Sequence, residues 1–373
     1  MLFNLLLCAI GFFVLSYAAD KLVEGASNLA LNLGVSKLVI GMTIVAAGTS
    51  LPEMVVSVNA SLKGNPELSL GNVVGSNIMN AALILGIAAL IQPIACQRQT
   101  IRREVPIMIG GAILLWFFAH TDQTITLNEG LIFVALFFLY IYLSYRWSKE
   151  EPETQESHEE GSDSVPPSAL RNFAFIGGGL VGLVIGSEVL VRGATEIARS
   201  IGVSDEVIGL TLIAIGTSLP ELATSVVAAR KGHSEITLGN VVGSNIFNIF
   251  GIAGCASVVC SFNGIPGSDI LNVSNNMLGI HIPLMVAISM SVLPIMSTGL
   301  KIVRAEGVLL VCFYLAYNVI LFQSSEMSKP KESNPLKQES GRIELLPASA
   351  PVSIEKAPVS NTTPESSTNS DRE

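Results

Sequence analysis

The stretch Gly-Met-Thr-Ile-Val-Ala-Ala-Gly-Thr-Ser-Leu-Pro-Glu at residues 41–53 returns at residues 209–221 as Gly-Leu-Thr-Leu-Ile-Ala-Ile-Gly-Thr-Ser-Leu-Pro-Glu. The similarity extends over forty residues, 41–80 against 209–248, at a constant offset of 168 and without a gap. Twenty-five of these forty positions carry the identical residue. The chain therefore contains an internal duplication.

Composition identifies the environment of the duplicated segments. Half of the residues are hydrophobic, 14% are charged, and the mean hydropathy is +0.56. A soluble domain has roughly 25% charged residues, so these values predict a polytopic membrane protein. Five scattered cysteines and four scattered histidines without CxxC spacing favour neither a disulfide framework nor a soft-metal site.

The apolar segments predict an all-α fold. A membrane helix needs about 20 apolar residues, and ten segments qualify: 3–31, 37–62, 68–94, 104–119, 128–147, 172–199, 205–230, 236–262, 279–298 and 304–322. The first lacks the basic n-region of a signal peptide and is read as a membrane helix. Five segments per repeat, an odd number, require the second half to be inverted in the membrane, which is typical of secondary transporters.

These segments divide the chain into four parts. Residues 1–147 form the first five-helix half, 148–170 an acidic linker, and 171–322 the second half. Residues 323–373 are rich in Ser, Pro, Glu and Lys without hydrophobic periodicity, which predicts a disordered tail.

Loop charges predict the orientation. With the N-terminus outside, the outer loops receive only Lys63 and Arg199, and the inner side receives Lys37, Arg98, Arg102, Arg103, Arg146, Lys149, Arg171, Arg230, Lys231, Lys301 and Arg304. The positive-inside rule therefore places both termini outside, on the periplasmic side of a bacterial-type inner membrane.

The Thr-Ser-Leu-Pro-Glu motif predicts a broken helix that carries a charge. Pro52 has no amide hydrogen to donate to Gly48, so the helix should break there and free carbonyls such as that of Ala46. Thr49 and Glu53 are four residues apart and so point to one side. On the following helix, Ser76 and Asn80 share a face in the same way.

Both copies together supply a set of hard oxygen ligands. Two carboxylates, hydroxyls, amide oxygens and backbone carbonyls suit Ca²⁺ or Na⁺, and the candidate residues are Glu53, Glu221, Thr49, Thr217, Ser50, Ser218, Ser76, Ser244, Asn80, Asn248, Ala46 and Ala214. Two negative charges match one Ca²⁺ or two to three Na⁺. Carboxylates about 5 Å apart repel by roughly 3 kcal/mol at an effective dielectric of 20. At least one should therefore hold a proton when no cation is bound.

Other polar and small residues have simpler explanations. The glycine pairs Gly71–Gly75 and Gly239–Gly243 have the spacing of close helix packing. Interhelical hydrogen bonding is expected of Asn72, Asn77, Asn240 and Asn245. A helical salt bridge is expected between Glu188 and Arg192.

At these motifs the chain resembles the cation/calcium exchanger superfamily, and in particular its prokaryotic sodium/calcium exchangers. The duplicated segments resemble the paired alpha repeats of that family, and the resemblance covers residues 1–322. It implies exchange of Ca²⁺ for Na⁺ by alternating access. It also implies Ca²⁺ ligation by Glu53 and Glu221, aided by Thr49 and Thr217, with Na⁺ sites completed by Ser50, Ser76, Ser218, Ser244, Ala46 and Ala214 and with Asn80 and Asn248 flanking the centre.

Three other functions are possible for such a sequence. H⁺/Ca²⁺ exchange would use the same glutamates, but the serines and alanine carbonyls suit Na⁺ and do nothing for a proton. A cation channel normally uses symmetric rings along a pore, and a scaffold would not need the glutamates. The sequence shows no nucleophile, base and oxyanion set, so neither an enzyme nor a cofactor is predicted, and no nucleic-acid or protein partner is evident.

Overall fold

The computed structural model describes residues 1–150, 168–203, 214–262 and 271–327, and these are almost wholly helical. Among them, seven helices are long and apolar enough to cross a membrane, or eight if the bent pair Lys37–Thr49 and Leu51–Leu62 forms one span. The all-helical membrane fold is confirmed, whereas the ten-span inverted plan stays a prediction. Most of the predicted linker and tail, and the start of the second duplicated segment, lie outside the described residues.

The helices of the first half are α1 (Leu2–Leu33), α2 (Lys37–Ile40), η1 (Gly41–Val45), α3 (Ala46–Thr49), α4 (Leu51–Leu62), α5 (Pro66–Ile78), η2 (Met79–Ile84), α6 (Leu85–Ile91), α7 (Arg98–Arg102), α8 (Glu104–Asp122) and α9 (Leu127–Glu150). Those of the second half are α10 (Ala169–Ser200), α12 (Ala214–Thr217), α13 (Leu219–Arg230), α14 (Ser234–Ile246), η4 (Phe247–Ala253), α15 (Gly254–Phe262), η5 (Met277–His281), α16 (Ile282–Ser297) and α17 (Arg304–Met327). The η segments are π-helical.

The duplication is visible in these bounds. The helices α4 and α5 begin and end 168 residues before α13 and α14, whereas α9 and α17 are offset by 177. Four short strands form two antiparallel pairs: β1 (Ile94–Ala95) pairs with β4 (Lys301–Ile302), and β2 (Thr124–Ile125) pairs with β3 (Leu271–Asn272). The larger offset of 177 relates β1 to β3 and β2 to β4. Each pair joins the first half to the second. These strands are not predicted from the sequence, because two residues carry no detectable alternation.

The helix break expected at Pro52 is present. Ser50 leaves helical geometry with φ −83° and ψ 6°, Pro52 lies in the first turn of α4, and the axes on either side bend by 44°. However, the carbonyl of Ala46 is not freed, because it accepts bonds from the amide of Ser50 (3.1 Å) and the hydroxyl of Thr49 (3.3 Å). The helical bond to Ala46 precedes the proline and therefore survives it.

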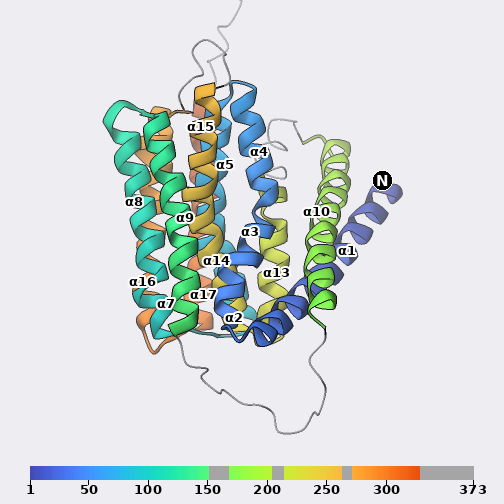
Figure 1. Cartoon of the computed structure of the whole chain (residues 1–373). Coiled ribbons are helices and arrows are strands. Elements are labelled where there is room, and N and C mark those ends of the chain that lie inside the picture. Colours follow the sequence, from blue (N-terminus) through green and yellow to red (C-terminus); the bar gives the residue numbers. More distant parts are fainter. Residues whose placement is uncertain (151–167, 204–213, 263–270, 328–373) are drawn as a thin grey trace, which may run out of the picture. The chain divides into compact units, whose positions relative to one another are not determined.

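The helices α1 and α10 lie side by side at one edge of the bundle (Figure 1). Glycines allow this contact: a Cβ on Gly11 would lie 2.5 Å from the Leu190 nitrogen, and one on Gly179 would lie 2.9 Å from the Leu22 nitrogen. Buried residues of this pair make up most of a second hydrophobic cluster, separate from the main core, to which Ile40, Val45, Ala228 and Ile236 also belong. Similarly, a Cβ on Gly243 would lie 2.7 Å from the Met42 backbone, which confirms close packing for the second glycine pair. The expectation is wrong for the first pair, because a Cβ on Gly71 would meet only Met277 Cε at 3.8 Å and one on Gly75 would have no neighbour within 4 Å.

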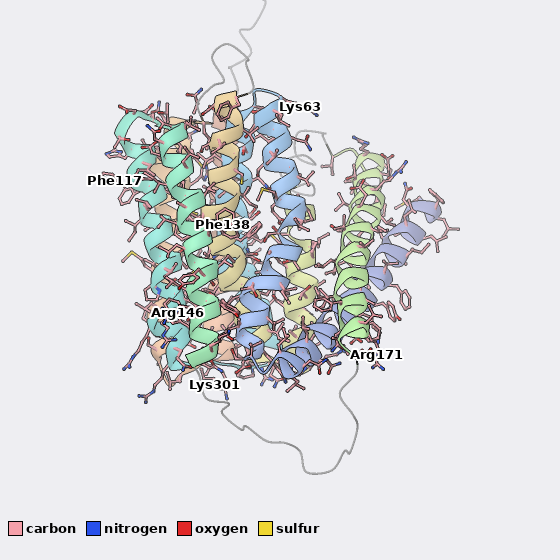
Figure 2. All side chains as sticks on the ribbon, viewed as in Figure 1. Lys63, Phe117, Phe138, Arg146, Arg171 and Lys301 are labelled. Atoms are coloured by element: carbon pink, nitrogen blue, oxygen red, sulfur yellow. The ribbon has the colours of Figure 1, made fainter. Side chains whose placement is uncertain are left out.

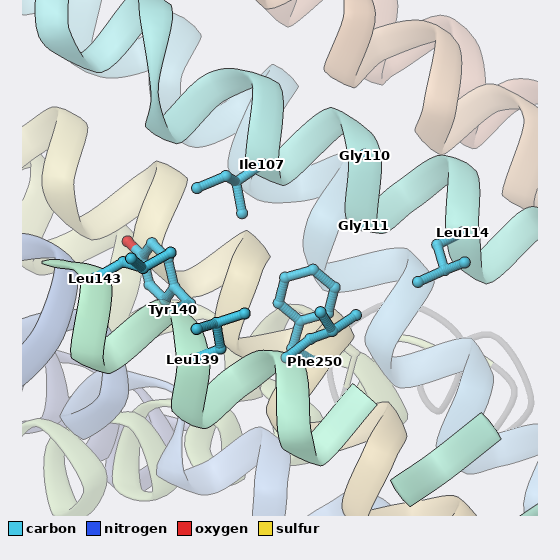
Figure 3. A pocket seen from close by; sticks show the side chains of 9 residues that line it. Ile107, Gly110, Gly111, Leu114, Leu139, Tyr140, Leu143 and Phe250 are labelled. Atoms are coloured by element: carbon cyan, nitrogen blue, oxygen red, sulfur yellow. The ribbon is translucent and has the colours of Figure 1, made fainter. Parts of the chain in front are cut away.

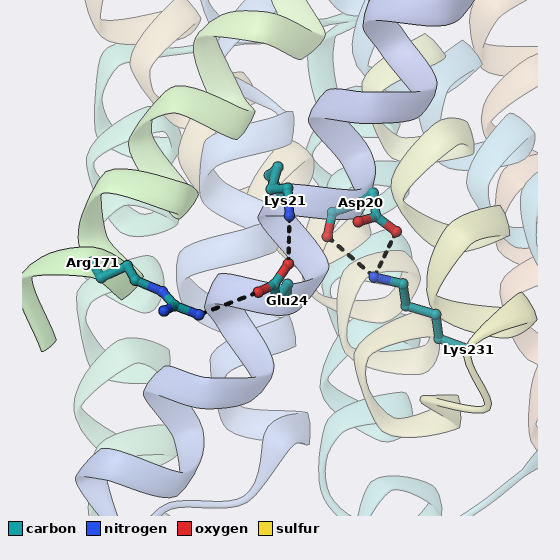
Figure 4. Close-up of polar contacts among 5 residues, drawn as sticks. All are labelled: Asp20, Lys21, Glu24, Arg171 and Lys231. Carbon is teal, nitrogen blue, oxygen red and sulfur yellow. Dashed lines mark hydrogen bonds and ion pairs between the residues drawn. The ribbon is translucent and has the colours of Figure 1, made fainter. Parts of the chain in front are cut away.

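Ion pairs gather where α1 meets the ends of α10 and α13 (Figure 4). Lys231 contacts Asp20 at 2.6 Å, while Glu24 contacts Lys21 at 2.7 Å and Arg171 at 3.7 Å. The labelled cations Arg146, Arg171 and Lys301 lie towards one end of the bundle, and Lys63 lies at the other (Figure 2).

The salt bridge expected between Glu188 and Arg192 is absent from the described part of the chain. Glu188 is exposed on α10. Exposed ion pairs contribute little free energy, so helical spacing alone does not hold one together.

The glycine contact between α1 and α10 gives a matched test on one helix. Gly179→Ala should lower the free energy of unfolding by about 1–3 kcal/mol, because the new methyl group meets backbone atoms. Gly178→Ala is the control, since a Cβ there has no neighbour within 4 Å. Unfolding in detergent micelles would measure both, and equal effects of the two variants would contradict the packing described here.

Candidate functional site

The two duplicated glutamates occupy equivalent positions after the helix breaks. Glu53 lies in the first turn of α4 and Glu221 in the first turn of α13. Each is only 1% exposed. A carboxylate near a helix N-terminus interacts favourably with the helix dipole, but two buried carboxylates still need partners.

Each glutamate accepts a hydrogen bond from the opposite half of the chain. Ser218 Oγ donates to Glu53 Oε1 at 2.9 Å, and Ser50 Oγ donates to Glu221 Oε1 at 3.0 Å. The two bonds are related by the offset of 168, so the broken helices face each other with their motifs crossed. Ser218 also contacts Ser76 Oγ at 3.3 Å, so α5, which carries Ser76, contributes to the same centre.

Two asparagines tie each broken helix to its neighbour. Asn72 Nδ2 donates to the Glu53 carbonyl at 3.1 Å and to Ser57 Oγ at 2.9 Å. Asn240 makes the equivalent bonds to Glu221 and Ser225, at 3.2 and 2.9 Å. The expected interhelical role of Asn72 and Asn240 is therefore confirmed. The sequence analysis did not single out Ser57 and Ser225, although both lie in the duplicated segment and are identical in the two copies.

The same asparagines receive the threonine hydroxyls of the opposite half. Thr49 Oγ1 donates to Asn240 Oδ1 at 3.1 Å, and Thr217 Oγ1 donates to Asn72 Oδ1 at 3.5 Å. Each threonine also lies within hydrogen-bonding reach of a carboxylate, Thr49 of Glu221 and Thr217 of Glu53. The threonine oxygens keep lone pairs that can contact a cation.

Several oxygens at this centre are buried and have no hydrogen-bond partner among the described residues. Four are carboxylate or amide oxygens and the fifth is a hydroxyl oxygen: Glu53 Oε2, Glu221 Oε2, Asn80 Oδ1, Asn248 Oδ1 and Ser244 Oγ. Buried polar atoms are normally paired. Unpaired acceptors that surround two carboxylates are the arrangement that a hard cation would satisfy.

The predicted site residues lie in buried surroundings. Those whose burial is described are buried except Thr217, which is half-buried, and Ala214 begins α12. No group of three or more His, Cys, Asp or Glu side chains suited to a metal occurs in the described ranges. Negative charge at the centre therefore comes from the two glutamates, and the other oxygens are neutral.

Helical geometry changes beside both asparagines that flank the centre. The π-helical segments η2 and η4 begin one residue before Asn80 and Asn248. Short π-helical segments are frequent at functional sites, since they redirect a side chain within a helix. Hydrophobic periodicity does not report them, so the sequence analysis did not predict them.

A hollow elsewhere in the fold does not belong to this centre. A groove of about 260 Å³ lies between α8 and α9, lined by Ile107, Gly110, Gly111, Leu114, Leu136, Leu139, Tyr140, Leu143 and Phe250 (Figure 3). Its lining is apolar and includes none of the predicted ligands. It is unsuited to a cation.

Residues 3–146 and 171–323 match the family described as sodium/calcium exchanger protein. The chain belongs to the sodium/calcium exchanger family. It is an integral membrane protein of that family.

Relatives and solved structures of similar length support the assignment. The chain is 38% identical to a putative antiporter, CaxA, of Alkalimonas amylolytica, with 87% of this chain and 100% of the relative covered. It is 36% identical to the sodium/calcium exchanger MaX1 of Methanosarcina acetivorans, with 86% and 98% covered. The structure of the sodium-calcium exchanger NCX_Mj superposes with a TM-score of 0.72 at 31% identity, covering 85% of this chain and 98% of that one.

The crossed serine–glutamate bonds predict destabilisation by each of two substitutions. Ser50→Ala and Ser218→Ala should each lower the free energy of unfolding by about 1–3 kcal/mol, because each removes a donor from a buried carboxylate. Ser291→Ala is a control, since that hydroxyl bonds only the Ile288 carbonyl on its own helix. Unfolding in detergent would compare the three, and a site variant that is no less stable than Ser291→Ala would contradict the reciprocal arrangement. Ser218→Ala is expected to lose the more of the two, because it also removes the contact with Ser76.

Proposed function

We propose that this family member is a sodium/calcium antiporter that moves Ca²⁺ across the membrane in exchange for Na⁺ by alternating access. The crossed pair of buried glutamates, each bonded to a serine of the opposite half and each with one oxygen unpaired, carries the proposal. Two negative charges surrounded by neutral oxygens fit one divalent ion or several monovalent ions at one centre. Membership of an exchanger family supports the same conclusion.

In this proposal Glu53 and Glu221 are the main Ca²⁺ ligands, with Thr49 and Thr217 beside them. The neutral oxygens that hold Na⁺ come from Ser50, Ser218, Ser76, Ser244, Ala46 and Ala214, and Asn80 and Asn248 flank the centre. The contact of 3.3 Å between Ser218 Oγ and Ser76 Oγ supports the assignment of these two serines to one site. The Ala46 carbonyl accepts the Ser50 amide, and its second lone pair becomes available when the single Thr49 hydroxyl hydrogen is donated to Asn240 Oδ1 instead of to Ala46.

The proposed architecture has ten spans in two inverted halves, 1–147 and 171–322, joined by a linker at 148–170 and followed by a tail at 323–373. Both termini lie on the outer side of a bacterial-type inner membrane. The grouping of Arg146, Arg171 and Lys301 towards one end of the bundle, opposite Lys63, supports this orientation (Figure 2).

H⁺/Ca²⁺ exchange at the same glutamates is the alternative. Protons would need the two carboxylates but not the neutral oxygens around them. The unpaired oxygens of Asn80, Asn248 and Ser244 therefore favour Na⁺ as the coupling ion.

Exchange can be measured directly in proteoliposomes. Vesicles loaded with Na⁺ and diluted into Na⁺-free buffer should take up radioactive Ca²⁺, and Glu53→Gln and Glu221→Gln should each abolish uptake, since each removes one of the two charges. Uptake that saturates and needs internal Na⁺ would also exclude a channel. Uptake that follows a proton gradient and ignores Na⁺ would replace this proposal with H⁺/Ca²⁺ exchange, and unchanged uptake in both variants would remove the glutamates from the mechanism.

A further inference from the structure

Behind the carboxylates, two asparagines donate to methionine sulfurs. Asn77 Nδ2 lies 3.6 Å from Met285 Sδ on α16, and Asn245 Nδ2 lies 3.5 Å from Met108 Sδ on α8. All four side chains are at most 1% exposed. A thioether sulfur is a weak acceptor and cannot donate.

This contact is built twice. The asparagines are 168 residues apart, and the methionines are 177 apart, which is the offset of the strands and of α9 and α17. A methionine that merely fills space has no reason to meet an amide hydrogen in both halves, because its flexible side chain adapts to many surroundings. The repetition indicates a defined polar contact.

The sulfur decides which way the amide of Asn77 points. With its Nδ2 facing Met285, its Oδ1 accepts from Asn248 Nδ2 at 3.2 Å. The amide hydrogens of Asn248 are therefore directed towards Asn77. The Asn248 oxygen, buried and without a hydrogen-bond partner in the described part of the chain, remains for a cation.

We propose that Met285 is a positioning residue that orients Asn77 and, through it, presents the Asn248 oxygen to the transported cation. The inference deepens the proposed function and rests on it. Asn245, held by Met108, donates to the Asn77 carbonyl at 3.4 Å and so fixes the same asparagine from the second half.

Met285→Leu tests this role while conserving volume. It should weaken Ca²⁺ binding about three- to tenfold, the effect of one hydrogen bond. Met296→Leu is the control on the same helix, since Met296 is fully buried and its sulfur has no hydrogen bond among the described residues. Binding is measured as the Kd obtained from the rise of the melting temperature of the purified protein with Ca²⁺ concentration, since a ligand stabilises the folded state by RT ln(1 + [L]/Kd).

A second background separates positioning from packing. In Asn248→Asp the side chain has no amide hydrogens to direct, so adding Met285→Leu should change Ca²⁺ binding less than twofold. An undiminished effect in that background, or equal effects of Met285→Leu and Met296→Leu, would overturn the positioning role. Because binding is read without transport, failure of the proposed antiport would show separately, as wild-type vesicles without Na⁺-driven uptake.

A different observation carries a second inference, about the ion pair between α1 and the end of α13. Lys231 Nζ contacts both the carboxylate and the backbone carbonyl of Asp20, at 2.6 and 3.4 Å. It ties α1, which packs with α10 around its own hydrophobic cluster, to the end of α13. The offset of 168 relates Asp20 to Glu188 and Lys231 to Lys63, so the duplication supplies a second acid and a second lysine.

The second pair is not formed in this structure. Glu188 and Lys63 are both exposed, and neither makes an ion pair with another described residue. The two lysines lie in equivalent turns, after α4 and after α13. The structure thus has one pair closed and its counterpart open.

We infer that the two ion pairs are alternating latches. When helices α1 and α10 shift together, the pair between Asp20 and Lys231 opens and the pair between Glu188 and Lys63 closes. Exchanging one exposed ion pair for another keeps the two states close in free energy, as cycling requires. The inference rests on the proposed alternating access and identifies the two ion pairs as contacts that change between its two states.

Cross-linking reports this switch without ion transport. In a full-length background lacking the five cysteines, Glu188→Cys and Lys63→Cys are joined by a bifunctional thiol reagent. Asp20→Asn should raise the cross-linked fraction about two- to fivefold, the population change expected from losing one half-exposed pair. Glu196→Gln is the control, because it breaks a pair with Arg199 within α10 alone. An unchanged fraction in Asp20→Asn, or an equal rise in Glu196→Gln, would overturn the latch.

Discussion

The structure depends on two buried carboxylates that neither half of the chain can satisfy alone. Glu53 is bonded by Ser218 and Glu221 by Ser50, so each charge is stabilised from across the duplication. The helix breaks, the asparagine tethers and the threonine hydroxyls all position these four side chains. Burial of charge is costly unless its partners are fixed, and that cost explains why so many polar contacts converge on one place in an apolar bundle.

The duplication is maintained at the level of single hydrogen bonds. The contacts of Asn72 recur at Asn240, and the amide–sulfur contact of Asn77 recurs at Asn245. The offset is 168 for α5 and α14 and 177 for β1 and β3, so the change falls outside the duplicated segments. The second half thus accommodates extra residues where they leave the paired motifs undisturbed.

Much of this could be predicted because the deciding residues are local in sequence. Pro52 beside Gly48 indicates a break, and a glutamate repeated in two apolar runs indicates a buried charged site. The rest depends on contacts that no spacing encodes. That Ser50 would meet Glu221 rather than Glu53, that Asn77 would meet Met285, and that Asn80 would lie in a π-helical turn are results of tertiary packing. The sequence also predicted wrongly that the Ala46 carbonyl would be free. Pro52 removes only the hydrogen bond to Gly48, four positions earlier, and leaves the bond from Ser50 to Ala46 in place.

The crossed bonds also have a consequence for biogenesis. Glu53 and its donor are separated by 165 residues, and Ser50 and its acceptor by 171. At a synthesis rate of 5–20 residues per second, Glu53 waits roughly 10–30 s for its partner to leave the ribosome. During that interval the nascent first half holds an unsatisfied carboxyl at membrane depth, which is tolerable as a neutral acid or near the lipid headgroups. The first half should therefore be a client of insertion machinery or chaperones until the second half arrives to complete it.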